Sequence, residues 1–211
     1  IKKKLYLMNN KITIGISSRL YKNNFEERDS LSTDWHKFFK KTSNLKNINW
    51  IILPNIGKDI IKYIKKNKIN RFILSGGEDI GIYKERDITE KEIIKLAIKN
   101  KIPLIGICRG MQLLYKFFNG KLTKTKKGSH IGKYHDVLIG KKIIKVNSFH
   151  NYGIKKVKLL KKFKILAATT DNFVEGFKLN NFPIYGIMWH PERNKKINSF
   201  DKNLFKKILY E

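Results

Sequence analysis

A single cysteine between a predicted strand and a predicted helix is the feature that most constrains this chain. The segment around it, residues 102–114, reads I-P-L-I-G-I-C-R-G-M-Q-L-L. The apolar run 104–107 follows a proline and has the length of a strand buried in a parallel sheet. The apolar spacing of 111–118 predicts a helix. Cys108 therefore stands at a strand-to-helix turn, with glycine two residues before it and two residues after it.

The glycines beside Cys108 indicate a sharp turn of the kind that presents a nucleophile. Such a turn crowds its neighbours, so residues without a Cβ are needed at Gly106 and Gly110. Backbone N–H groups and the positive end of the helix dipole are then expected to face the sulfur and to favour the thiolate, the nucleophilic form. The alternative is a buried structural cysteine, which is common for free thiols. The paired glycines favour the nucleophile.

The first half of the chain alternates strands with helices over short connections. We expect strands at 11–17, 50–53, 71–74 and 104–107, and helices that open at 32–34 and span 59–67, 88–99 and 111–118. This alternation predicts an α/β fold with a parallel sheet covered by helices on both faces. Ligands of such folds bind outside the carboxyl ends of the strands, where Gly76, Gly77 and Cys108 are all predicted to lie.

The second half has a different character. Residues 120–140 are rich in Lys, Gly and Thr and lack a helical period, which is typical of hairpins or loops. Strand candidates follow at 143–146, 164–170, 174–178 and 184–189, and 200–209 is expected to form a closing helix. Because the sequence has neither internal repeats nor a linker-like segment, we expect a single domain over residues 1–211.

His190 is the histidine best placed to act as a base for Cys108. A cysteine nucleophile needs a base, and that base needs a group to orient it. His190 ends a predicted strand in M-W-H-P-E, where Pro191 favours extended backbone before it. Residues two apart in an extended segment point to the same side, so Glu192 is expected to hydrogen-bond one ring nitrogen while the other faces the thiol. The alternative is a packed histidine beside a surface glutamate.

Gly76 and Gly77 have two interpretations. Either the pair forms a turn that needs positive φ, or it lets a ligand approach the backbone and directs an N–H group at a developing oxyanion. The cysteine turn in the next strand–helix unit favours the second interpretation. The N–H of Arg109, the residue after the nucleophile, is then the natural second donor.

The composition limits the partners expected for this chain. The net charge is +29, from 46 Lys and Arg against 17 Asp and Glu, which raises nucleic acid or an anionic membrane as a partner. The lysines are spread along the whole chain and form no aromatic–basic platform, so we expect no specific nucleic-acid binding. Such a spread is typical of a lysine-rich bias in the coding sequence. No apolar run has membrane-spanning length, and the single cysteine suits a reducing, cytoplasmic location.

No metal site is predicted from the sequence. One cysteine excludes a multi-cysteine site. His130, His135 and His150 do not show the spacing of a metal-binding motif, so each is interpreted as structural or as facing the substrate.

Several motifs together resemble those of class I glutamine amidotransferases. They are S-G-G-E-D at 75–79, C-R-G-M-Q at 108–112 and M-W-H-P-E at 188–192. R-D-I-T-E at 86–90 and V-N-S-F-H at 146–150 are similar to the γ-glutamyl hydrolase branch, which includes the γ-glutamyl-γ-aminobutyrate hydrolases. The resemblance covers nearly the whole chain. It implies a flavodoxin-like three-layer sandwich with a central, mostly parallel sheet.

The resemblance also implies a role for individual residues. It implies a catalytic triad, an oxyanion hole made by two backbone amides, a glutamyl pocket, and no cofactor. The residues are Cys108, His190 and Glu192 for the triad, Gly77 and Arg109 for the oxyanion hole, and Gly76, Gln112, Asn147, Ser148, Phe149 and His150 for substrate binding. The implied reaction is hydrolysis of a γ-glutamyl amide through a thioester, with release of glutamate.

The leaving group is less constrained. The segment 77–86 is short, whereas many relatives carry a longer insertion there. This short segment and the motif R-D-S-L-S-T-D-W at 28–35 resemble compact hydrolases of capsule phosphoramidate pathways, which cleave γ-glutamyl-CDP-amidate. We therefore expect an anionic leaving group, with Lys84 and Lys133 as candidate phosphate contacts. The alternatives are γ-glutamyl-γ-aminobutyrate or another γ-glutamyl amide as substrate, a glutaminase subunit that supplies ammonia to a partner synthetase, and a catalytically silent basic binding protein.

Overall fold

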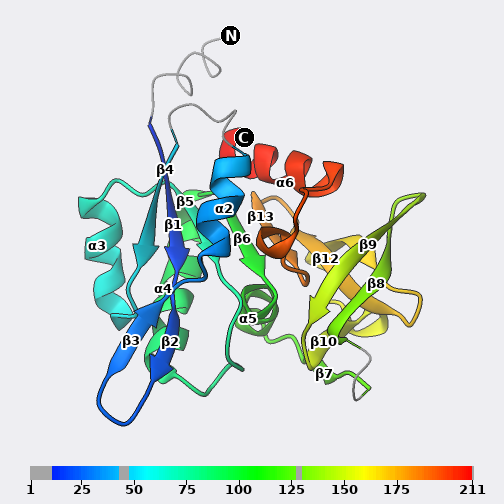
Figure 1. The fold of residues 1–211 in the computed structure, drawn as a ribbon, viewed down its shortest axis with the longest axis horizontal. Coiled ribbons are helices and arrows are strands. Elements are labelled where there is room, and N and C mark those ends of the chain that lie inside the picture. The colour runs from blue at the N-terminus through cyan, green and yellow to red at the C-terminus, as the bar shows by residue number, and fades with distance from the viewer. Residues whose placement is uncertain (1–10, 43–47, 127–129, 211) are drawn as a thin grey trace.

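The computed structural model describes residues 11–42, 48–126 and 130–210 (Figure 1). The strands are β1 (Ile12–Ser17), β2 (Arg19–Lys22), β3 (Glu27–Ser30), β4 (Ile48–Leu53), β5 (Arg71–Leu74), β6 (Leu104–Ile107), β7 (Thr123–Lys124), β8 (Ile131–Ile139), β9 (Lys142–Phe149), β10 (Tyr152–Lys155), β11 (Phe163–Ala168), β12 (Phe173–Leu179) and β13 (Ile184–Ile187). The helices are α2 (Asp34–Lys41), α3 (Ile60–Lys66), α4 (Lys84–Asn100), α5 (Arg109–Phe117) and α6 (Ser199–Tyr210), with short 3₁₀ turns at Gly57–Asp59, Lys156–Lys158 and Pro191–Arg193.

One mixed sheet forms the centre of the molecule. Its strand order is β4-β1-β5-β6-β13-β12-β11-β8-β9, with β10 paired to β12 and β7 paired to β10. The first five strands in this order, from β4 to β13, are parallel to one another. β6 and β13 are buried at every position, as expected for strands covered on both faces. The predicted α/β fold with a mostly parallel central part is confirmed, and the carboxyl ends of these strands meet at one edge.

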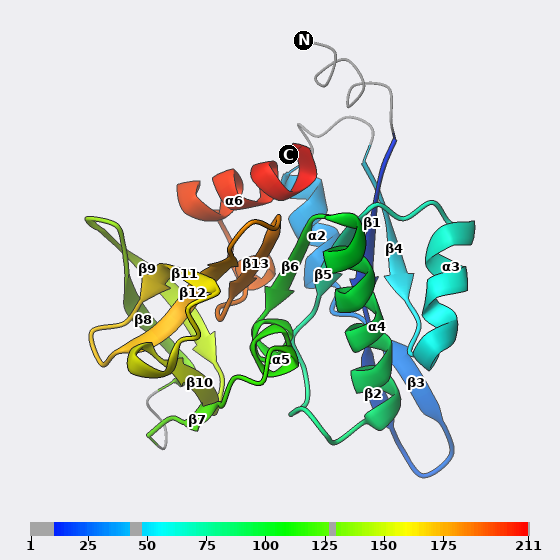
Figure 2. The ribbon, with the colours of Figure 1, turned by 180° about the vertical axis from the view of Figure 1, so that it is seen from behind.

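Helices cover both faces of the parallel strands and complete the three layers. α2 and α6 lie on the face toward the viewer in Figure 1, and the view from behind shows α4 and α5 on the other face (Figure 2). Phe38 of α2 and Phe205 of α6 pack with ring centroids 4.7 Å apart in the first core. Ile93 and Ala97 of α4 and Met111 of α5 are fully buried in the second. Both cores include residues of the parallel strands that carry the predicted site.

The rest of the sheet is antiparallel. β12, β11, β8 and β9 follow β13 with antiparallel pairing, and β8 and β9 form a long hairpin. For the described part of 120–140, the prediction of hairpins or loops is confirmed, because β8 pairs with β9 in a hairpin and its side chains are mostly exposed. Residues 127–129 lie outside the described residues. This hairpin lies beyond the helices, on the side of the sheet away from α3 (Figure 1).

Two element boundaries differ from the sequence prediction and both affect the site. The helix expected from 88 begins at Lys84, because the backbone N–H of Gly81 is bound by the carboxylate of Asp87 at 2.9 Å and closes the entry turn. The strand expected through residue 189 ends at Ile187, so His190 lies in a loop. Among the described residues, no helix is long and apolar enough to cross a membrane.

Candidate active site

Cys108 occupies a strained turn between β6 and α5. Its backbone has φ 50° and ψ −105°, a conformation that residues with a Cβ rarely adopt. A Cβ on Gly106 would lie 2.4 Å from the carbonyl carbon of Gly110, and a Cβ on Gly110 would lie 2.3 Å from the carbonyl oxygen of Leu74. The Cys108 N–H donates to the carbonyl of Ile187 at 2.8 Å, which ties the turn to β13. The predicted need for glycine at both flanks is confirmed.

His190 is held beside this turn from several directions. Its Nδ1 lies 2.7 Å from Oε1 of Glu192. Its backbone is clamped by the side chain of Asn147, which accepts from the His190 N–H and donates to the His190 carbonyl, each at 2.8 Å. The ring packs so closely on Gly76 that a Cβ there would lie 2.5 Å from Cε1.

The contact between His190 and Glu192 was predicted, but its geometric reason was wrong. The two residues do not belong to an extended segment, because Pro191–Arg193 forms a 3₁₀ turn. The turn brings Glu192 back under the imidazole instead. Both side chains are buried, at 3% and 4% exposure. The packed histidine with a surface glutamate is therefore excluded as an interpretation.

The charges at this site favour a thiolate–imidazolium pair. Burial alone raises the pKa of the Cys108 thiol, but the charge and hydrogen bond of His190, aided by His150 and the Arg109 backbone N–H, lower it below the ordinary value. Burial likewise lowers the pKa of His190, and the charge and hydrogen bond of Cys108 and the contact with Glu192 outweigh it and raise that pKa to about 9. The charges of Cys108 and His190 thus stabilise each other, and the role of these residues as a catalytic pair stays a prediction.

Arg86 fixes the orientation of the peptide between Gly76 and Gly77. Its Nη2 donates to the carbonyl oxygen of Gly76 at 3.0 Å and to that of Ser75 at 3.1 Å. A trans peptide is planar, so the Gly77 N–H points away from Arg86. Gly77 has φ 147°, and a Cβ there would lie 2.3 Å from Nη1 of Arg86. The turn with positive φ is confirmed at Gly77, and the approach of a ligand to this backbone stays a prediction.

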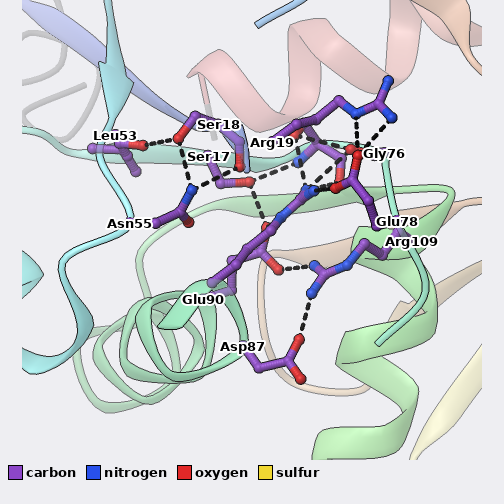
Figure 3. Close-up of polar contacts among 12 residues, drawn as sticks. Ser17, Ser18, Arg19, Leu53, Asn55, Gly76, Glu78, Asp87, Glu90 and Arg109 are labelled. Atoms are coloured by element: carbon purple, nitrogen blue, oxygen red, sulfur yellow. Dashed lines mark hydrogen bonds and ion pairs between the residues drawn. The ribbon is translucent and has the colours of Figure 1, made fainter. Parts of the chain in front are cut away.

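A buried ion network lies beneath these turns and joins them (Figure 3). The Arg109 guanidinium contacts the carboxylates of Glu90 and Asp87, and Arg86 Nε lies 3.2 Å from Oε1 of Glu90. Arg86 and Glu90 are fully buried, and Arg109 is nearly so. The hydroxyl of Ser17, at the end of β1, donates to Glu90 at 2.7 Å. The network thus ties α4, α5 and the ends of β1 and β5 into one unit.

Glu78 closes the exposed side of this network. Its two carboxylate oxygens contact Arg86 at 3.0 Å and Arg19 at 2.6 Å. The pKa of Glu78 is lowered, because its backbone hydrogen bond and the two guanidinium groups outweigh the effect of partial burial. The loop that carries Gly77 is therefore held at both ends by arginine.

The remaining residues predicted to bind substrate lie near the site, and most have partners within the protein. Gln112 Nε2 donates to the carbonyl of Tyr152 at 2.9 Å, and the Ser148 hydroxyl donates to the carbonyl of His130 at 2.6 Å. Phe149 is 42% exposed, and its ring lies 5.8 Å from that of His190. His150 is buried, and its Nδ1 lies 3.1 Å from the Tyr152 carbonyl oxygen. Their contact with a glutamyl group stays a prediction.

The motif R-D-I-T-E was predicted only as a family resemblance, and its structural role was missed. Arg86 and Glu90 are four residues apart, the spacing at which helical side chains meet. That spacing was the available signal, but the predicted helix began at residue 88 and left Arg86 outside it. The side-chain contribution of Arg109 was also missed, because only its backbone was considered.

Comparison with known proteins establishes the family. Residues 32–210 match the family described as Glutamine amidotransferase class-I. The γ-glutamyl-CDP-amidate hydrolase of Campylobacter jejuni is 39% identical over 194 residues, which cover 88% of this chain and 92% of that protein. The chain belongs to the class I glutamine amidotransferase family.

Other proteins share the sequence and the fold to lesser degrees. A subunit of the glutamine-hydrolysing GMP synthase of Pyrococcus furiosus is 32% identical over 148 residues, covering 67% of this chain and 74% of that protein. The crystal structure of a glutamine amidotransferase from Thermotoga maritima superposes with a TM-score of 0.61 at 19% identity, covering 87% of this chain and 77% of that one. The second likeness supports the fold alone.

We expect Glu90→Gln to destabilise the protein by about 3–5 kcal/mol, because it leaves two buried guanidinium groups without their shared carboxylate. The matched control is Glu92→Gln on the same helix. Glu92 pairs with Lys95, which is 59% exposed, so its loss should cost less than about 1 kcal/mol. Chemical denaturation at neutral pH measures both. Equal effects of the two substitutions would contradict the structural role of the network.

We also expect Cys108 to react with iodoacetamide at mildly acidic pH, because its thiol pKa lies below the ordinary value near 8.5. His190→Ala removes the imidazolium, raises the thiol pKa and should slow alkylation at about pH 6.5 by at least tenfold. Cys108 is the only cysteine, so the rate reports on it alone. A wild-type rate that rises only around pH 8.5 or above would contradict the thiolate–imidazolium pair, and so would a profile that His190→Ala leaves unchanged.

Proposed function

We propose that this protein is a cysteine-dependent hydrolase that cleaves a γ-glutamyl amide and releases glutamate. The observation that carries the proposal is the strained turn of Cys108 beside a buried His190 that contacts Glu192 at 2.7 Å, with the pKa of His190 raised by the charge of Cys108. A thiolate beside an imidazolium is the arrangement that acyl transfer to cysteine requires.

In the proposed reaction the sulfur of Cys108 attacks the γ-carbonyl carbon, and the carbonyl electron pair moves onto oxygen. The imidazolium of His190 then protonates the leaving nitrogen, and the C–N bond breaks to give a γ-glutamyl thioester. His190, now neutral, takes a proton from water, which attacks the thioester and frees glutamate and the thiolate. Glu192 keeps the ring oriented and stabilises its positive charge. This sequence uses no cofactor.

The backbone N–H groups of Gly77 and Arg109 are the proposed oxyanion hole. The Arg109 N–H already contributes a hydrogen bond to the thiol. Arg86 acts as a positioning residue, because its bond to the Gly76 carbonyl sets the direction of the Gly77 N–H. The glutamyl pocket is proposed to border Gly76, Gln112 and the segment 147–150.

The proposed substrate is γ-glutamyl-CDP-amidate, which would yield CDP-amidate for capsule phosphoramidate synthesis. The support is the relative from Campylobacter jejuni, which carries this activity in its name and matches nearly the whole chain. The net charge of +29 suits a diphosphate leaving group, with Lys84 and Lys133, both exposed, as proposed contacts. Because salt screens such attraction, kcat/KM is expected to fall with added salt. A cytoplasmic location is part of the proposal, since it keeps the catalytic thiol reduced.

A second candidate function is that of a glutaminase subunit which passes ammonia to a synthetase. The similarity to a glutamine-hydrolysing GMP synthase favours it. Such a subunit would be feeble without its partner, whereas a stand-alone hydrolase is active alone.

A substrate panel with the purified protein tests the proposal. The panel contains γ-glutamyl-CDP-amidate, γ-glutamyl-γ-aminobutyrate, a γ-glutamyl peptide and glutamine. We expect the highest kcat/KM for the nucleotide conjugate, and a loss of at least about 1,000-fold in Cys108→Ala with the fold retained. A preference for glutamine or for γ-glutamyl-γ-aminobutyrate would reject the proposed leaving group. Near-normal turnover by Cys108→Ala would reject the mechanism itself.

A further inference from the structure

Three histidines and a glutamate, far apart in sequence, meet in the antiparallel part of the sheet. His130 lies just before β8, His135 on β8, His150 just after β9, and Glu175 on β12. The potential ligand atoms of His130, His150 and Glu175 all lie within 4.8 Å of one another. The rings of His130 and His135 have centroids 4.9 Å apart. The hairpin register and the packing of β8 and β9 against β11 and β12 create this cluster, which is why no motif spacing revealed it.

The two most buried histidines each have one ring nitrogen occupied by an acceptor. Nε2 of His130 lies 3.2 Å from a carboxylate oxygen of Asp171, and Nδ1 of His150 lies 3.1 Å from the carbonyl oxygen of Tyr152. In a neutral imidazole the nitrogen that faces an acceptor carries the proton, so the other nitrogen presents a lone pair. Nε2 of His150 lies 3.5 Å from Oε1 of Glu175, and one ring nitrogen of His130 lies within 4.8 Å of the ligand atoms of both residues. Histidine ligands of metal ions are commonly oriented by such carboxylate and carbonyl partners.

Five buried atoms of the cluster lack hydrogen-bond partners. They are Nδ1 of His130, Nε2 of His135, Nε2 of His150 and both carboxylate oxygens of Glu175, judged over the described residues. His130, His150 and Glu175 are 2%, 3% and 1% exposed. A buried carboxylate without hydrogen bonds is strongly unfavourable unless a cation neutralises it. The cluster thus holds several buried nitrogen and oxygen atoms without a hydrogen-bond partner among the described residues.

The spacing of these atoms suits a shared cation better than direct hydrogen bonds. Nε2 of His135 and Nε2 of His150 lie 3.4 Å and 3.5 Å from the two oxygens of Glu175. A charge-assisted N–H···O bond would be shorter, at about 2.7–2.9 Å. Ligands bound tetrahedrally at about 2.0–2.1 Å from one metal ion lie about 3.3 Å from each other. The two separations from Glu175 are close to that second value, and the 4.8 Å span of the ligand atoms of His130, His150 and Glu175 would contract when the ion binds.

We propose that His130, His150 and Glu175, with His135 as a fourth ligand, bind one divalent transition-metal ion of the Zn²⁺ type. Imidazole nitrogen together with a carboxylate oxygen is a donor set for such ions, whereas Mg²⁺ and Ca²⁺ prefer oxygen alone. The assigned role is structural. The ion would clamp the β8–β9 hairpin onto β12, and so hold His150 and its neighbour Phe149 in place beside His190. His150 also belongs to the proposed glutamyl pocket, but the test of this inference does not depend on the proposed reaction, because metal binding is measured in a chain without the thiol.

Metal binding to a chelator-treated Cys108→Ser chain tests this proposal. The substitution removes the thiolate as a competing ligand, so hydrolytic activity plays no part in the result. Calorimetry should find one Zn²⁺ per chain, and Co²⁺ should give the intense visible bands of a four-coordinate site. Added in this background, Glu175→Gln should weaken Zn²⁺ binding by at least about 100-fold. Asp171→Asn changes the group that contacts Nε2 of His130, without removing a proposed ligand, and should weaken binding by about 10- to 100-fold.

His36→Ala is the matched control, because His36 is an exposed histidine on α2 outside the cluster. It should leave Zn²⁺ affinity unchanged. If Glu175→Gln proves misfolded by circular dichroism, His130→Gln is measured in its place with the same expectation. Absence of stoichiometric Zn²⁺ binding would overturn the proposal, and so would Zn²⁺ binding that survives the loss of Glu175 or His130. Either result would leave the cluster as a proton-sharing network only.

Discussion

The backbone conformation of Cys108 is the constraint on which the rest of the site depends. A residue with φ 50° and ψ −105° carries strain of about 1–3 kcal/mol, which the surrounding structure must offset. Gly106 and Gly110 let α5 start directly against β5 and β6, at distances that no side chain would permit. The turn is thereby fixed by backbone packing on three adjacent strands. The sulfur is placed at the carboxyl edge of the sheet, next to the first N–H groups of α5.

The charged residues around this turn form two groups, one at the proposed reacting atoms and one beneath them. In the first group, the charges of Cys108 and His190 lower the pKa of the thiol and raise that of the imidazole, and Glu192 contacts the imidazole. Below it, the side chains of Arg86, Glu90 and Arg109 form a buried network of ion pairs. Buried ion pairs contribute little net stability compared with apolar packing, but breaking one is costly. The network is therefore best understood as a device that fixes the relative position of two turns, one carrying Gly77 and the other Cys108.

Local signals in the sequence were sufficient for the parts of the site that depend on local geometry. The cysteine turn was predictable because its glycines are required by steric contacts within a few residues. The parallel strands were predictable because their apolar runs are short and are bounded by turn residues. The contact of His190 with Glu192 was predicted through an extended segment, yet the chain achieves it with a 3₁₀ turn. The start of α4 was missed because Arg86, Asp87 and Glu90 are polar but buried, which breaks the apolar period that marks a helix.

Non-local features could not be predicted in the same way. The cluster of His130, His150 and Glu175 depends on the strand register and on the order of strands in the sheet. The spacing of these residues in the sequence determines neither. Asn147 was expected to face the glutamyl group through a resemblance, whereas its side chain clamps the backbone of His190. In both cases the sequence identified residues worth attention but not the partners that define their roles.

Rapid-quench mass spectrometry of the intact protein tests the central claim, that the γ-glutamyl group passes through Cys108. The protein is mixed with γ-glutamyl-CDP-amidate, quenched in acid within the first turnover, and digested to locate any added mass. The predicted result is a transient adduct of one γ-glutamyl group on the peptide that contains Cys108, which forms as substrate is lost and decays as glutamate appears. An adduct on a different residue, or a complete first turnover with Cys108 unmodified at every quench time, would contradict it.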